Sequence, residues 1–143
     1  MSVIVTDTGF GPETWEGGFT DLETLGASEG RPDPAPDLAL DLPSDTDPAA
    51  LADRLDAIGM IRVDFPSSAD GRGFTIARRL RLMGFAGRLR ARGHVIADQY
   101  AMARRAGFDE IEIADDLAAR QPQDQWLRRA DWRSHNYQAR LRA

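Results

Sequence analysis

Three glycines, each followed by an apolar residue, divide the middle of the chain into units of nearly equal length. They are Gly59, Gly84 and Gly107, spaced 25 and 23 residues apart, and each such interval accommodates one strand and one helix. Apolar residues recur at helical spacing before each glycine, and a short apolar or alternating run follows it. Repeated units of this kind predict a single α/β domain with a mainly parallel sheet and right-handed crossovers.

The expected elements follow from this pattern. Strands are predicted at Val3–Val5, Leu38–Leu42, Met60–Phe65, Leu89–Arg92 and Glu110–Ile113. Helices are predicted from Asp47-Pro48 to the stop at Gly59, over about Phe74–Met83, and over His94–Ala106 up to Gly107. A full (β/α)8 barrel needs about 250 residues. We therefore expect either a small open, Rossmann-like sheet or a half-barrel-like unit.

The chain divides into three regions by composition. Residues 1–37 are rich in Gly, Pro and acidic residues, and predict an irregular N-terminal arm with one short strand and a linker at Pro32–Pro36. Residues 38–113 form the predicted β-α core. Residues 114–143 predict a helical C-terminal tail that begins at an N-cap pair, Asp115-Asp116, and carries Trp126, Trp132 and Tyr137.

The composition excludes several classes of function. The chain has no cysteine, which rules out disulfides, thiol redox chemistry and a cysteine-ligated iron–sulfur cluster held by this chain alone. No apolar run approaches the roughly 18 residues of a membrane span, and the start lacks a signal-peptide pattern. We expect a cytoplasmic protein without membrane contact. His94 and His135 lack the spacing of metal ligands, so no metal site is expected.

The charge is unevenly distributed along the chain. Residues 1–70 carry 15 acidic residues and 3 arginines (−12), and residues 71–143 carry 8 acidic residues and 15 arginines (+7). Every cation is arginine, which a GC-rich coding sequence would explain, although forked guanidinium groups also suit carboxylate, phosphate or sulfate. This separation of negative and positive charge along the chain is suited to orienting a protein partner electrostatically. Nucleic acid is not expected, because the chain is acidic overall and aromatic residues do not interleave with the basic stretch.

One glycine-flanked arginine precedes a predicted helix where parallel α/β domains bind ligands, at the carboxyl ends of the strands. In Asp70-Gly71-Arg72-Gly73 the glycines let the backbone approach an anion and the helix dipole adds to the charge of Arg72. In the structural alternative, Asp70 caps the turn, the glycines take positive φ, and Arg72 is solvated or pairs with Asp64. From the next strand, either Arg90 or Arg92 would join Arg72 in a clamp of two arginines around the anion. The candidate anion-binding residues are Asp70, Gly71, Arg72, Gly73, Arg90, Asp98 and Gln99.

Two predicted strands alternate charged and apolar residues. One face would carry Ile61, Val63, Phe65, Leu89 and Ala91, and the other Arg62, Asp64, Arg88, Arg90 and Arg92. A central parallel strand covered on both faces should instead be continuously apolar. The pattern indicates either a sheet poorly covered on one side or an Asp64–Arg90 pair across a polar groove or subunit interface. No motif for a cofactor or a catalytic nucleophile is present, so the cofactor and any enzymatic activity stay open.

The stretch from Asp64 to Ile113 resembles the bacterial DUF934 family. The resemblance is carried by the motifs Phe65-Pro66, Asp70-Gly71-Arg72-Gly73-Phe74-Thr75-Ile76-Ala77-Arg78, Leu80-Arg81, Gly87-Arg88-Leu89-Arg90-Ala91, Asp98-Gln99 and Ala106-Gly107-Phe108-Asp109. The family's members are proteins of unknown function linked to sulfite reduction. The resemblance implies an accessory protein of assimilatory sulfite reduction that docks to the sulfite reductase haemoprotein or its electron donor.

The residues themselves support a second hypothesis, a protein or enzyme that binds a small oxyanion or phosphorylated ligand through Arg72 and Arg90. A homodimer in which the C-terminal tails pack reciprocally is compatible with both hypotheses.

Overall fold

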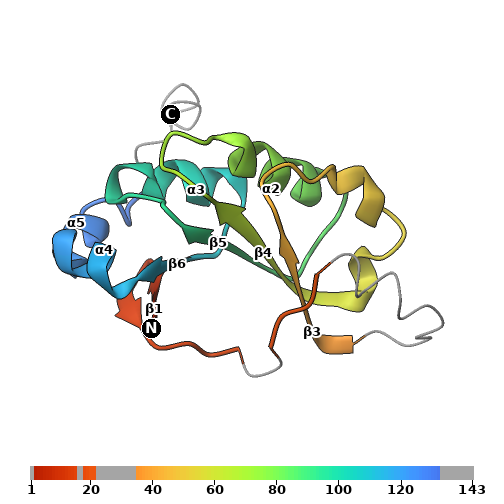
Figure 1. The fold of residues 1–143 in the computed structure, drawn as a ribbon, viewed down its shortest axis with the longest axis horizontal. Coiled ribbons are helices and arrows are strands. Elements are labelled where there is room, and N and C mark those ends of the chain that lie inside the picture. Colours follow the sequence, from red (N-terminus) through yellow and green to blue (C-terminus); the bar gives the residue numbers. More distant parts are fainter. Residues whose placement is uncertain (1, 16–17, 22–34, 133–143) are drawn as a thin grey trace.

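The computed structural model describes residues 2–15, 18–21 and 35–132, and its centre is one open sheet in the order β2-β1-β6-β5-β4-β3 (Figure 1). The strands are β1 (Ser2–Thr6), β2 (Gly9–Gly11), β3 (Ala35–Leu42), β4 (Ile58–Phe65), β5 (Arg88–Gly93) and β6 (Glu110–Ala114). Strands β3 to β6 run parallel, whereas β1 is antiparallel to β6 and β2 to β1. The predicted α/β class and mainly parallel sheet are confirmed, in the open form.

The two longest helices lie side by side over one face of the sheet (Figure 1). The α-helices are α2 (Arg72–Leu82), α3 (Tyr100–Ala106), α4 (Asp115–Arg120) and α5 (Gln123–Leu127), and the 3-10 helices are η1 (Pro48–Leu51), η2 (Leu55–Ala57) and η3 (Ala97–Gln99). The predicted apolar strand residues are all buried in one core, namely Ile61, Val63, Phe65, Leu89 and Ala91. Phe65 contacts Phe74 of α2 and Phe108, so this is the helix-covered face. The alternating charged residues therefore occupy the opposite face.

Two predicted helices are shorter than expected. The segment after Asp47 forms η1 and η2 rather than one helix, and Gly59 lies inside β4 instead of ending a helix. Pairing of β4 with the edge strand β3 draws Ile58 into the sheet, so tertiary structure overrides the local helical pattern. The helix predicted from His94 begins only at η3, because the His94 N–H donates to the Phe65 carbonyl at 3.0 Å and prolongs the strand end.

The predicted helix stops at Gly84 and Gly107 are confirmed, whereas the predicted cap of the next helix is not. Both glycines take positive φ, and Gly107 is the left-handed C-cap of α3. Asp115 and Asp116 occupy the first turn of α4, where their charge suits the helix dipole, and the N-cap is Ala114.

The N-terminal region contributes to the sheet more than expected. Residues 1–37 were predicted to hold one strand, but both β1 and β2 lie there and β3 begins at Ala35. Strand β1 lies beside β6, and Asp7 after it accepts hydrogen bonds from the Tyr100 hydroxyl and the Arg104 guanidinium. In the tail, Trp126 is buried against Tyr100. Tyr137 and the Pro32–Pro34 part of the linker lie outside the described residues. Within the described residues no helix is long and apolar enough to cross a membrane.

Candidate functional site

The predicted Asp70–Gly73 segment is a self-contained turn before α2. The Asp70 carboxylate accepts from the Arg72 backbone N–H at 3.1 Å and from its Nη2 at 2.7 Å, and Arg72 also donates to Ser44. Hydrogen bonding from the Arg72 side chain lowers the pKa of Asp70 to about 2. Arg72 therefore pairs with Asp70 and not with Asp64, which confirms Asp70 as the cap of the turn.

The glycines of this turn serve packing. A Cβ on Gly73 would run into the Phe65 ring, so glycine lets the first turn of α2 lie directly on β4. Gly71 has φ −91°, so the positive φ considered for it is wrong. This geometry requires glycine at Gly73 without reference to a ligand.

Arg90 lies elsewhere, fully buried on the helix-free face (0% exposed). Its Nε donates to Glu110 at 2.6 Å and its Nη1 to Glu112 at 2.8 Å, both on the neighbouring strand β6. Its outer edge makes a bidentate pair with Glu13, at 2.7 and 2.5 Å. Arg72 and Arg90 share no partner within the described residues, so the prediction that they form one clamp is wrong. Strand alternation points Arg90 away from α2.

Arg90 belongs to a network of ion pairs that crosses four strands. The network also joins Arg62 to Asp41 and Glu112, and Arg88 to Glu110. The alternative of an Asp64–Arg90 pair is wrong, because the register sets Arg90 level with Arg62 and Glu110, and Asp64 level with Arg92. The sequence did carry a signal for this network. Arginines alternate on β5 and glutamates on β6, so opposite charges meet when the two strands pair in register.

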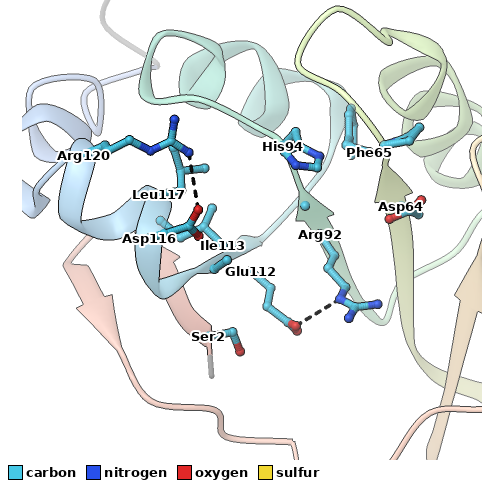
Figure 2. Close-up of a pocket in the computed structure, with 13 residues that line it drawn as sticks. Ser2, Asp64, Phe65, Arg92, His94, Glu112, Ile113, Asp116, Leu117 and Arg120 are labelled. Atoms are coloured by element: carbon cyan, nitrogen blue, oxygen red, sulfur yellow. Dashed lines mark ion pairs between the residues drawn. The ribbon is translucent and has the colours of Figure 1, made fainter.

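A cavity of about 480 Å³ opens at the carboxyl ends of β4, β5 and β6 and beside α4 (Figure 2). We call it the carboxyl-edge cavity. Its apolar wall includes Phe65, Ile113 and Leu117. Its polar residues are Ser2, Asp64, Arg92, His94, Glu112, Asp116 and Arg120. This is where parallel α/β domains are expected to bind ligands.

The two arginines of the cavity are loosely held. Arg92 is 51% exposed and its Nε lies 3.3 Å from Glu112 Oε2, while Arg120 is 70% exposed and lies 3.7 Å from Asp116. Both pairs are drawn in Figure 2. Glu112 is bound more closely by Arg62 and Arg90, at 3.0 and 2.8 Å. The guanidinium groups of Arg92 and Arg120 can therefore turn toward a ligand at small cost.

None of the seven predicted anion-binding candidates lines this cavity, Asp98 and Gln99 included. Asp98 pairs with Arg129 at the surface and not with Arg90 or Arg92. Gln99 accepts from the Ile96 N–H at 3.0 Å and donates to the Ser68 carbonyl at 2.7 Å, which fixes the start of η3. Of Arg90 and Arg92, the two arginines considered for completing the site, Arg92 is the one that lines the cavity. Ser2 and Arg120 were missed because they come from outside the β-α repeat.

Acid should weaken the fold partly through Glu13. Hydrogen bonding from Arg90 lowers the pKa of Glu13 from its ordinary 4.5 to about 2. A carboxylate with a lower pKa in the folded chain stabilises it fully above about pH 4.5, and this contribution is lost as the pH falls toward 2. We expect Glu13→Gln to flatten the pH dependence of the urea midpoint within this window, whereas Asp116→Asn at an exposed pair leaves it unchanged. Equal slopes for wild type and Glu13→Gln would contradict this assignment.

Among the described residues, no group of three or more His, Asp or Glu side chains is placed to hold a metal ion.

Comparison with known proteins gives a match to a protein family. No curated protein and no solved structure matches the chain. The family model described as "Bacterial protein of unknown function (DUF934)" matches residues 39–143, which contain α2, α3 and strands β4 to β6. The chain therefore belongs to the DUF934 family.

Proposed function

We propose that the protein binds a small oxyanion or its organic ester in the carboxyl-edge cavity and serves as an accessory component of sulfite reduction. The cavity with the loosely paired Arg92 and Arg120 carries the first part of the proposal. Forked guanidinium groups bind sulfur and phosphorus oxyanions through paired N–H donors. The resemblance to proteins linked to sulfite reduction supports the second part.

The size and lining of the cavity favour an ester over a bare ion. A volume of about 480 Å³ falls in the range of sites for small organic ligands, and far exceeds one sulfite or sulfate. The Phe65 and Leu117 side chains offer apolar contact, while Asp64 accepts hydrogen bonds from ligand hydroxyls. An adenylyl sulfate or a flavin nucleotide combines these features, with the oxyanion on Arg92 and Arg120.

Arg92→Ala is expected to weaken ligand binding about tenfold or more, because a charge-assisted hydrogen bond contributes about 1.5–3 kcal/mol. Isothermal titration calorimetry with sulfite, sulfate, adenylyl sulfate and flavin mononucleotide measures this. Arg120→Ala should weaken binding similarly. Its matched control is Arg128→Ala, which removes an equally exposed arginine in a helical i,i+4 pair remote from the cavity. Binding that survives Arg92→Ala and Arg120→Ala unchanged would refute the site.

A second function, docking to the sulfite reductase haemoprotein or its electron donor, is favoured by the outer surface of α2 and α3. Leu82 and Met102 are the most exposed large apolar side chains described, at 80% and 54%. Arg78 and Arg105 are exposed on the same two helices. Exposed apolar residues among cations suit an acidic protein partner.

Co-purification from sulfate-grown cells tests the docking function. We expect the reductase or its electron donor to be retained by wild type and lost with Leu82→Glu, which places an acidic group where the partner is acidic. Leu127→Glu, on α5, is the control because it introduces the same charge on another helix. Absence of any association, together with unchanged sulfite reduction after gene deletion, would count against this function.

A further inference from the structure

The helix-free face of the sheet is covered by a segment that binds it as a peptide would. We call the described residues 12–15 and 18–21 the strap; in Figure 1 this red segment runs beneath the strands, opposite α2 and α3. Thr20 forms a parallel bridge with Leu40 of the edge strand β3 through two backbone hydrogen bonds of 2.8 and 2.7 Å. Pairing of an irregular segment with a sheet edge is the geometry by which extended peptides are recognised.

The strap's side chains supply one acid and two aromatic rings to three arginines. Glu13 takes the outer edge of Arg90. The Phe19 ring lies over Arg62, with its centroid 3.5 Å from the guanidinium carbon, and the Trp15 ring lies 5.9 Å from that of Arg88. Glu13, Phe19 and Trp15 therefore each contact a guanidinium group, which is the chemistry of an acidic and aromatic ligand.

Glu13 is the exchangeable carboxylate among those bound to Arg90. Glu110 and Glu112 belong to β6 and are buried, whereas Glu13 is 40% exposed and stands in irregular backbone. Its withdrawal leaves a buried guanidinium with its bidentate edge open. Another carboxylate in the same position would restore both hydrogen bonds.

The residues matched by the family model include the arginines of this face but not the strap. The match begins at Ala39, so Arg62, Arg88 and Arg90 lie within it and the whole strap lies outside. The matched region therefore contains the three arginines, whereas the strap precedes it in the sequence.

We propose that this face is a binding surface for an acidic, aromatic segment of a partner protein, which the strap occupies within the same chain. The partner's carboxylate replaces Glu13 on Arg90, and its aromatic residues replace Phe19 and Trp15 over Arg62 and Arg88. The three arginines of this surface do not line the carboxyl-edge cavity, although Glu112 contacts both, and the test does not depend on the ligand bound there.

The test uses the full chain with Glu13→Ala and Phe19→Ala, which loosen the strap while leaving every arginine in place. A fluorescein-labelled peptide of residues 11–21 is titrated and its anisotropy followed. We expect the double variant to bind it about tenfold or more tightly than wild type does, since two charge-assisted hydrogen bonds become available. A peptide with glutamine in place of Glu13 should lose most of this affinity.

Other outcomes overturn the proposal. Equal binding of the two peptides would show that the carboxylate is not recognised. If acetate or sulfate raises the melting temperature of the double variant but the peptide does not bind, the face takes only free anions. A dimer of the double variant in light scattering would assign the surface to self-association. Glu13→Gln alone, a milder change, repeats the titration should the double variant fail to fold.

Discussion

Replacing Arg90 with alanine is expected to lower the free energy of unfolding by about 3–5 kcal/mol, the usual cost of removing one partner from a buried ion pair. Arg90 is fully buried, and its loss leaves Glu110 and Glu112 without one of their cations under the strap. A domain of this size has a total stability of about 5–15 kcal/mol, so the variant loses between about a fifth and all of it. Urea unfolding followed by far-UV circular dichroism measures the change.

The control for this variant is Arg78→Ala, on the exposed surface of α2, which should shift stability by no more than about 0.5 kcal/mol. Arg90→Lys should fall between the two, because one ammonium group cannot meet the three carboxylates that the guanidinium reaches. A loss below about 1 kcal/mol for Arg90→Ala would contradict the assigned role.

Replacing Phe65 with alanine is expected to lower the free energy of unfolding by about 3–5 kcal/mol. The mechanism differs from that of Arg90→Ala, because this change creates a cavity in the core. The Phe65 ring packs against Phe74 and Phe108, with centroids 5.0 and 5.8 Å apart, and closely against Gly73. Removing it takes away the surface on which the first turn of α2 rests. Thermal and urea unfolding report the loss.

Phe65→Leu is the graded comparison and should cost less than half as much, since most of the apolar volume remains. Phe65 also lines the carboxyl-edge cavity, so ligand affinity should fall in Phe65→Ala even at temperatures where the variant is folded. If Phe65→Ala unfolds with the wild-type midpoint, the ring is not the support of α2 that its contacts indicate.

The fold was predictable wherever the local pattern and the sheet agree. The alternation along β4 and β5 separated Ile61, Val63 and Leu89 from the charged residues correctly, because period-two patterns fix the face directly. The helix expected after Asp47 failed because pairing between β3 and β4 is a long-range effect that no local window contains.

The site was only partly predictable for the same reason. The rule for parallel sheets pointed to the edge where the cavity opens, and Arg92, which lines that cavity, was among the arginines considered there. Arg90 was assigned to that edge although it lies in the middle of β5, where its side chain pairs with the glutamates of β6, whereas Arg92 lies at the end of the strand. Its contact with Glu13 joins residues 77 positions apart, and nothing in the sequence indicates which acidic residue of the N-terminal region would bind it.

The position of β1 has a consequence for how the chain folds. Val3 pairs with Ile113, so the first strand emerges from the ribosome 110 residues before its neighbour in the sheet. Until that contact closes, strand β6, in which Ile111 and Ile113 alternate with glutamates, has one open edge, and open strand edges are where nascent chains aggregate. Closure over so long a loop is slow compared with assembly of the local β-α units. We therefore expect β1, together with its partner β2, to join the sheet after the parallel strands, and β1 then covers the edge of β6 that synthesis leaves exposed.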